Sequence, residues 1–240
     1  MVLEEPNALL DLQALDTSID QHKHRRATLP ERAALVEIAR RVEQTRSALR
    51  DAAAARDEVA SRQDALESEL TAAERRSAEV SRRLYGGEVS ASRELQAMSE
   101  ELDSLKARVS GIEDRLLAVL EEREPLDDQV TVHESELARL RAEGDGIGRA
   151  LAAAEEQVDS EIAELDRRRE ETAARVPESL SAQYERLRSR LGGVAVARLV
   201  GNRCDGCHLT LPATELDRIR HLPAGEMVTC DQCGRILVVG

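Results

Sequence analysis

The chain of 240 residues contains no phenylalanine, no tryptophan and only two tyrosines. A compact globular core of this length would normally contain aromatic side chains, whereas alanine, leucine, glutamate and arginine dominate here and 34% of the residues are charged. This composition is typical of a coiled coil, in which apolar side chains meet along a seam. The sequence therefore argues against a large aromatic core and predicts a mostly α protein.

Long apolar runs are also missing. No stretch of about eighteen apolar residues is present to span a bilayer, and the first residues lack the basic and apolar regions of a secretory signal. We therefore expect a cytoplasmic protein that does not enter a membrane.

Cysteine is scarce, and all of it lies in the last quarter of the chain as two C-x-x-C motifs separated by 22 residues. A two-residue spacer lets both thiolates of one motif point at the same ion, so the paired motifs predict one structural Zn²⁺ per chain. The alternatives are two disulfides or four buried thiols, which the regular spacing and the missing secretory signal disfavour. The four predicted ligands are Cys204, Cys207, Cys230 and Cys233.

The residue after each C-x-x-C motif bears on the shape of the loop and on the set of ligands. Gly234 follows the second motif, and such a loop usually needs a residue there that tolerates a positive φ. His208 occupies the equivalent place in the first motif, where it is either a fifth candidate ligand or an exposed side chain. Four thiolates already complete a tetrahedral shell, which favours the exposed histidine.

Heptad spacing indicates two long helices. From Leu95 to Arg168, steps of three and four visit 22 positions, of which 17 are apolar, and an earlier tract from Leu35 to Leu84 has 11 apolar residues in 15 positions. The polar exceptions within the seam are expected to fix the register of the two helices.

A reversal separates the two tracts, with its tip near residues 85–92. Paired glycines end the first helix there and Ser90 or Ser92 can cap the second, which predicts an antiparallel hairpin. A reversal near residue 88 pairs residues whose numbers sum to about 175, so that residues 27–30 face residues 144–148. Proline in the first segment and glycines in the second predict a shared bend at 27–30/144–148.

The chain is predicted to have three parts. A long antiparallel coiled-coil hairpin occupies residues 1–176, a neck helix and linker occupy residues 177–193, and a small β-rich C4 zinc ribbon occupies residues 194–240. The ribbon has too few large apolar side chains to fold alone, so metal binding, worth on the order of 10 kcal/mol, should supply most of its stability.

Three residues at the tip are predicted to form a partner-binding surface: Tyr85, Arg93 and Glu94. A coiled-coil turn needs a glycine and a cap, but it does not need an exposed tyrosine followed by a charged pair, and tyrosine and arginine are common anchors of interfaces. The alternative is that Tyr85 packs over the last seam layer beside Leu84 and Leu95.

Nucleic acid is the alternative partner. Residues 192–240 contain five arginines and five acidic residues, so the ribbon is neutral and offers no basic face for phosphates and no aromatic side chain for stacking. Charge runs of this kind are more often solvated faces or pairs across a seam. The best basic candidates near the bend and the neck are Lys23, Arg25, Arg26, Arg186, Arg188, Arg190, Arg198 and Arg203.

The sequence argues against an enzyme. A four-thiolate zinc site has no open position for a water molecule, and no nucleophile motif or phosphate-binding glycine loop is present. We therefore expect no catalytic residue and no small-molecule substrate.

Short motifs along nearly the whole chain resemble those of a known family. They are Leu15-Asp16, Leu29-Pro30-Glu31, Tyr85-Gly-Gly, Arg93-Glu-Leu-Gln96, Tyr184-Glu-Arg-Leu, Cys204-x-x-Cys207-x-x-x-Leu211-Pro212 and Cys230-x-x-Cys233-Gly-Arg-Ile-Leu237. The chain resembles the bacterial C4-type zinc-ribbon proteins that carry a long coiled-coil hairpin ahead of the ribbon.

This resemblance implies an adaptor without known catalysis. Some members of the family are linked to sigma-54-dependent transcription, to flagellar or type III secretion assembly, and to nucleic acid. The prediction is therefore a zinc-binding scaffold, with a monomer favoured, that presents the hairpin tip and the ribbon to protein partners. The alternative is a nucleic-acid-binding regulator that uses the ribbon and the basic neck.

Overall fold

A computed structural model describes residues 7–87, 89–222 and 226–239. The chain divides into two compact units. Residues 34–147 form one, called the hairpin unit below, and the residues up to 33 together with those from 148 onward form the other, called the base unit. Among the described residues, no helix is long and apolar enough to cross a membrane.

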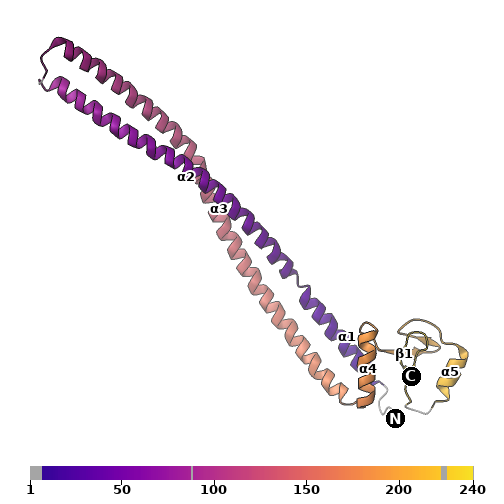
Figure 1. The fold of residues 1–240 in the computed structure, drawn as a ribbon. Coiled ribbons are helices and arrows are strands. Elements are labelled where there is room, and N and C mark those ends of the chain that lie inside the picture. The colour runs from indigo at the N-terminus through magenta and orange to yellow at the C-terminus, as the bar shows by residue number, and fades with distance from the viewer. Residues whose placement is uncertain (1–6, 88, 223–225, 240) are drawn as a thin grey trace. The chain divides into compact units, whose positions relative to one another are not determined.

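The two heptad tracts form the two longest helices, α2 (Pro30–Tyr85) and α3 (Ser92–Ala173), which run antiparallel in the hairpin unit (Figure 1). Every predicted seam position from Leu35 to Leu84, and from Leu95 to Leu165, is buried or half-buried, and only the last one, Arg168, is exposed. The predicted helical hairpin is therefore confirmed, because the apolar heptads do meet along one seam.

The predicted pairing of residues 27–30 with residues 144–148 is wrong. A Cβ added to Gly144 would lie 3.2 Å from Cγ2 of Ile38, so this glycine faces a later part of α2. In an antiparallel hairpin, the numbers of two facing residues sum to twice the residue number at the centre of the reversal. An error of three or four residues in that centre is therefore doubled, and it moves the facing residue by about two helical turns.

The two arms differ at the level of the expected bend. Helix α1 (Ala8–Ala27) ends just before Pro30, whereas α3 continues as a helix through residues 144–148, and the shared bend stays a prediction. A glycine inside a helix is unfavourable by only about 1 kcal/mol, and packing of the buried seam residue Leu140 and its neighbours outweighs this.

The break in the first arm lies opposite another part of α3. Arg26 donates to Asp159 at 2.6 Å on one side of the break, and Arg32 is ion-paired with Glu155 on the other side. Residues 155–159, rather than 144–148, therefore face the end of α1.

Two glycines end α2 at the tip, as predicted. A Cβ on Gly86 would lie only 2.6 Å from the carbonyl oxygen of Arg82, and Gly87 has a φ of 80°. Only glycine fits both conditions without strain. Residue 88, at which the reversal was centred, lies outside the described residues.

The start of α3 differs slightly from the expectation. The carbonyl of Ala91 accepts the amide groups of Glu94 and Leu95 at 3.0 and 3.1 Å, so Ala91 is the residue that precedes the first helical turn. The expected caps, Ser90 and Ser92, flank this position by one residue on either side.

In the base unit, the predicted neck helix, α4 (Glu178–Arg190), is packed into a core. This core joins α1, the end of α3, α4 and the first and last strands of the ribbon. Its buried members are Ala8, Leu9, Leu12, Val176, Leu180, Tyr184, Leu187, Ala195, Val196, Ile236 and Val238.

The ribbon is a four-stranded sheet with the order β2-β1-β4-β3. The two central strands are parallel, and each pairs with an antiparallel edge strand. One face of the sheet, with Val196 and Val238, joins the core described above, and the other, with Ala197 and Leu237, packs around the cysteines. Its elements are β1 (Val196–Val200), β2 (Arg203–Cys204), α5 (Ala213–Arg220), β3 (Val228–Thr229) and β4 (Ile236–Val239).

Candidate metal centre

The two cysteine motifs form loops with the same hydrogen bonds. In the first loop, the amide of Cys204 donates to the carbonyl of Leu209 at 3.0 Å, and the amide of His208 donates back to Cys204 at 2.8 Å. In the second loop, Cys230 and residues 234–235 repeat this pattern at 2.8 and 2.7 Å. Each loop therefore turns its pair of thiols in the same direction.

Both loops place a residue with positive φ after the second cysteine, as predicted. Gly234 has a φ of 73° and His208 a φ of 62°. The His208 side chain is exposed and is not part of the group of potential ligands that the structure brings together, so the interpretation of an exposed histidine agrees with the structure.

The four cysteine sulfur atoms converge on one point. All four lie within 4.8 Å of one another, and the distances from Cys204 to Cys233 and from Cys207 to Cys230 are both 3.9 Å. A tetrahedral zinc site with Zn–S bonds of about 2.3 Å has sulfur–sulfur edges of about 3.8 Å. The residues present therefore fit a single structural Zn²⁺ in a shell of four thiolates.

The electrostatics of the thiols also suit a dication. Burial raises the pKa of Cys204 and raises that of Cys230 to about 12, so these thiols favour the thiolate only when a cation offsets its charge. Burial acts in the same direction on Cys233, but hydrogen bonds from the backbone and side chain of Arg235 oppose it, and its pKa falls to about 7. Zinc supplies the missing positive charge and holds the shell closed.

Two residues near the thiolates, Arg235 and Glu215, have roles that the sequence did not predict. The Arg235 side chain donates from Nε to the carbonyl of Val194 at 3.0 Å and covers Gly206. A Cβ on Gly206 would lie 2.6 Å from Cδ of Arg235 and 2.8 Å from Cβ of Ala197. Glycine inside the first motif is therefore required for the arginine to approach the site.

A buried carboxylate holds the second loop from another side. Glu215 of α5 is only 6% exposed, and its Oε1 accepts the backbone amide of Asp231 at 3.4 Å. A single glutamate in a short helix offers no sequence signal for this role, because the contact joins residues 16 positions apart.

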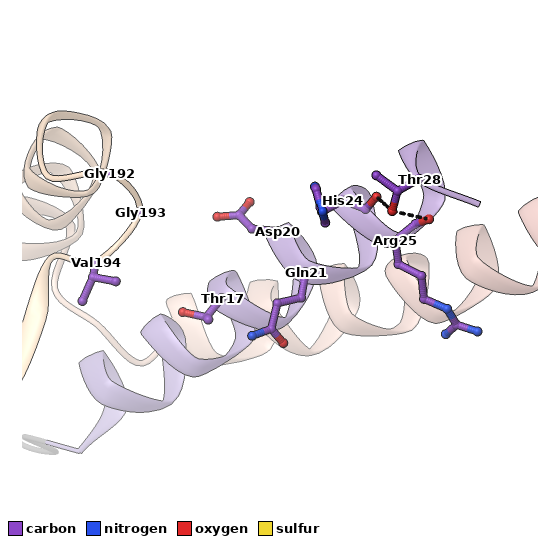
Figure 2. Close-up of a pocket in the computed structure, with 9 residues that line it drawn as sticks. All are labelled: Thr17, Asp20, Gln21, His24, Arg25, Thr28, Gly192, Gly193 and Val194. Carbon is purple, nitrogen blue, oxygen red and sulfur yellow. Dashed lines mark hydrogen bonds between the residues drawn. The ribbon is translucent and has the colours of Figure 1, made fainter. Parts of the chain in front are cut away.

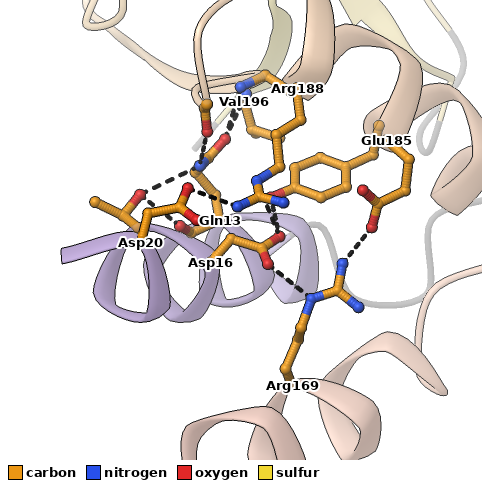
Figure 3. A network of polar contacts seen from close by, with 11 residues as sticks. Gln13, Asp16, Asp20, Arg169, Glu185, Arg188 and Val196 are labelled. Carbon is orange, nitrogen blue, oxygen red and sulfur yellow. Dashed lines mark hydrogen bonds and ion pairs between the residues drawn. The ribbon is translucent and has the colours of Figure 1, made fainter. Parts of the chain in front are cut away.

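A second polar network lies in the base unit (Figure 3). Asp16 is 1% exposed and accepts hydrogen bonds from the Tyr184 hydroxyl at 2.6 Å and from Nε of Arg169 at 2.7 Å. Burial raises the pKa of Tyr184, and the Asp16 carboxylate raises it further, so the phenol remains a donor. Asp16 and Tyr184 belong to two of the motifs that the chain shares with the family. They are 168 positions apart in the sequence, and the structure brings them into direct contact.

Gln13 joins this network to the ribbon. Its Oε1 accepts the amides of Ala195 and Val196 at 2.7 and 3.3 Å, and its Nε2 donates to the carbonyl of Gly193 at 2.8 Å. Helix α1 therefore satisfies backbone groups at the point where the chain enters β1.

An open groove of about 570 Å³ lies between α1 and residues 192–194 (Figure 2). Some of its polar groups have partners inside the protein: Asp20 accepts from Arg188 at 2.6 Å, and the Thr28 hydroxyl donates to the carbonyl of His24 at 2.9 Å. The Thr17 and Thr28 hydroxyls that line the groove both donate to backbone carbonyls, of Gln13 and His24.

The predicted nucleic-acid residues are spread over α1, α4 and strands β1 and β2. Three are ion-paired inside the protein, namely Arg25 with Glu161 at 3.1 Å, Arg26 with Asp159 at 2.6 Å and Arg188 with Asp20 at 2.6 Å. The others are exposed and form no ion pair with a described residue: Lys23, Arg186, Arg190, Arg198 and Arg203. Their role in binding nucleic acid stays a prediction.

The predicted tip residues are all exposed. Tyr85 is 77% exposed, and the last seam layer, with buried Val80, is instead covered by Leu84 and Val89. The alternative in which Tyr85 packs over this layer is therefore wrong. Arg93 and Glu94 are exposed in the first turn of α3, and a binding role of this surface stays a prediction.

Both the sequence and the fold of this chain are similar to those of known proteins. The chain is 36% identical over 242 residues to the uncharacterized protein Rv2229c of Mycobacterium tuberculosis, covering 98% of this chain and 95% of the relative. A solved structure from Mycobacterium smegmatis has the same fold, with a TM-score of 0.85, 24% identity and full coverage of both chains.

More distant structures share the fold at lower similarity. CT398 from Chlamydia trachomatis matches with a TM-score of 0.59 and 18% identity, and it covers 98% of this chain and 97% of its own. Two family models match the sequence itself: the CT398-like coiled-coil hairpin domain over residues 12–192 and the C4-type zinc ribbon domain over residues 203–237. This chain therefore belongs to the family of proteins with a CT398-like coiled-coil hairpin, here followed by a C4-type zinc ribbon.

Proposed function

We propose that this chain is a non-catalytic adaptor of the cytoplasm, which presents the hairpin tip and the zinc ribbon to protein partners in transcriptional or assembly regulation. The observation that carries the proposal is the 77% exposure of Tyr85 at a tip whose seam is already covered by other side chains. An exposed aromatic side chain with no packing role is typical of an interface anchor.

Two further observations support a non-catalytic role. The four-thiolate shell leaves zinc no open position for a water molecule or a substrate. The two matching family models describe a coiled coil and a zinc ribbon, and neither is a catalytic family. A reducing cytoplasm also suits four thiols that must remain available to the metal.

The proposal is tested by recovering partners from the native host with the full-length chain as bait. The double variant Tyr85→Ala/Arg93→Glu removes the exposed anchor and reverses one charge at the tip. We expect at least one protein partner to be lost while the melting temperature stays unchanged, because neither side chain packs in the core.

A matched control keeps the same kind of change but moves it away from the tip. Leu117 is 59% exposed and Arg141 is exposed on the same helix, so Leu117→Ala/Arg141→Glu should retain all partners. Equal recovery of every partner by both variants and by the unmodified chain would contradict the proposal.

Nucleic acid is the competing partner in this experiment. It has less support, because three of its eight candidate cations are ion-paired within the protein. Nuclease treatment of the lysate separates the two functions. Partners that disappear after treatment, and that depend on Arg186 and Arg190 instead of Tyr85, would favour the nucleic-acid regulator.

A further inference from the structure

The hairpin unit has an uneven distribution of charge. Residues 75–94 at the tip contain five arginines and three glutamates, a net charge of +2. The remainder of the unit, residues 34–74 and 95–147, contains twelve lysines and arginines and 23 acidic residues, a net charge of −11. The tip of the hairpin unit therefore has a net positive charge, whereas the remainder of the unit has a net negative charge.

The cations of the two regions also differ in how they are paired. Outside the tip, ten of the twelve cations form an ion pair with a described residue, and the exceptions are Lys106 and Arg141. Among the described tip residues, only Arg76 is ion-paired with another described residue, Glu101, at 2.8 Å. The tip arginines that are exposed and form no ion pair with a described residue are Arg75, Arg82, Arg83 and Arg93.

Helix stability explains only part of this cluster. Arg82 and Arg83 lie in the last turn of α2, where a cation is favourable to the helix dipole. Arg93 lies in the first turn of α3, where the same dipole disfavours a cation and favours the neighbouring Glu94. The helix dipole therefore does not account for an exposed arginine at this place.

The side-chain chemistry of the tip defines what it can bind. A guanidinium group only donates hydrogen bonds, so its partner must offer acceptors, and a carboxylate accepts two of them in parallel. Tyr85 stands beside Arg82 on the outward face of α2, three residues apart, and supplies apolar contact area. Together they form a short cationic surface with an aromatic anchor.

The small extent of this surface favours a protein over nucleic acid. Four exposed arginines can neutralise only a few phosphates, and a longer polyanion would meet the exposed Glu74, Glu100 and Asp103 next to the tip. A compact acidic patch on a folded protein avoids this repulsion. We infer that the hairpin tip binds an acidic surface of a protein partner through Tyr85 and the exposed arginines around it, an inference that rests on the proposed adaptor function.

Site-specific cross-linking in the native host tests this inference. Tyr85 of the full-length chain is replaced by the photo-reactive residue p-benzoyl-phenylalanine, which keeps an aromatic side chain, and adducts are identified after irradiation. We expect an adduct to a protein peptide that lies beside several aspartates or glutamates. Its yield should fall at least fivefold when Arg82→Gln/Arg93→Glu is added.

The two substitutions have opposite effects on the helix dipoles. Arg82→Gln removes a favourable cation from the last turn of α2, whereas Arg93→Glu places an acid where the dipole of α3 favours one, so the melting temperature should change little. The matched control is Arg50→Gln/Arg141→Glu, which alters the net charge by the same amount away from the tip and should leave the yield unchanged.

The outcomes separate this inference from the proposed function. No adduct at all would overturn both, because an adaptor tip must touch its partner. A protein adduct that is insensitive to Arg82→Gln/Arg93→Glu, or that lies in a basic or neutral surface, would overturn only the acidic-partner inference. An adduct to nucleic acid would overturn it as well and would favour the alternative regulator.

Discussion

The hairpin unit and the base unit bury their apolar residues in different ways. In the hairpin unit, two helices meet along one seam, and many seam residues remain half-buried beside fully buried ones such as Ile112 and Leu140. In the base unit, helices and strands enclose a common core that also holds the carboxylate of Asp16. The first unit repeats one contact many times, whereas the second depends on a few contacts between distant residues.

This difference predicts different responses to damage. A seam spreads its stability over many similar layers, so the loss of one layer is a local defect. The base unit combines a metal, a buried ion pair and a small core, and each of these holds several elements together. The variants below test this contrast in the order of their expected effects.

Removal of a zinc ligand should have the largest effect. Cys230→Ser opens the shell and removes metal binding worth on the order of 10 kcal/mol to the ribbon. Because Ile236 and Val238 share a core with α1 and α4, hydrogen-exchange protection should fall in those helices as well as in the ribbon. Protection of residues 45–140 should be unchanged, and the helical circular dichroism should fall only slightly.

The control for this variant is His208→Ala, which changes an exposed residue of the same loop and should retain zinc. Full protection of α4 in zinc-free Cys230→Ser would show that the base helices fold independently of the metal-bound ribbon. A metal content near zero in the unmodified protein would contradict the zinc assignment itself.

Loss of the buried carboxylate should have the next largest effect. Asp16→Ala leaves the Tyr184 hydroxyl and Nε of Arg169 without their acceptor, and breaking such a buried pair costs about 3 to 5 kcal/mol. The free energy of unfolding of the base unit, measured by hydrogen exchange, should fall by this amount.

Asp20→Ala serves as the comparison. This variant removes the acidic partner of Arg188 at Asp20, whose side chain is 50% exposed. The free energy of unfolding should therefore fall by only about 0 to 1 kcal/mol. Equal losses in the two variants would mean that burial of Asp16 does not strengthen its contacts.

A seam truncation should be milder and confined to the hairpin unit. Leu140 is fully buried, and Leu140→Ala should cost about 2 to 4 kcal/mol in the protection of nearby amides of α2 and α3. Leu117→Ala removes the same atoms from a side chain that is 59% exposed and should change stability by less than about 0.5 kcal/mol. A loss of zinc in either variant would show that the two units are coupled.

The smallest effect on stability is expected at the tip. Tyr85→Ala should change the free energy of unfolding by less than about 0.5 kcal/mol, since the side chain is 77% exposed and lies outside the seam cluster. Thermal melting monitored at 222 nm measures this directly. A drop of several degrees would assign Tyr85 a structural role and would weaken the proposed interface.

Local patterns were sufficient to predict the elements of the fold. The heptads and the glycine pair at the tip each depend on residues close together in sequence, and each forms the expected structure. The zinc site was also predictable, because two C-x-x-C motifs are local signals that need only one common point in space.

Contacts between distant residues were not predictable in the same way. The position of Glu215 beside the second loop follows from how α5 packs, and no local pattern marks it. Arg235 belongs to the second cysteine motif, but its approach to Val194 and Gly206 depends on how distant segments pack. The register of the hairpin failed for a related reason, since it depends on how a short loop closes and a small error there is doubled along the arms.

The sequence by itself determined the helical seam, the reversal and the set of four zinc ligands, because periodicity and spacing are properties of neighbouring residues. Only the tertiary structure decided which residues face each other across the seam, that Asp16 meets Tyr184 beneath the ribbon, and that Tyr85 points to solvent while Leu84 and Val89 cover the seam. The physical reason is that burial and pairing are set by the surroundings of a side chain, which the order of residues along the chain does not specify.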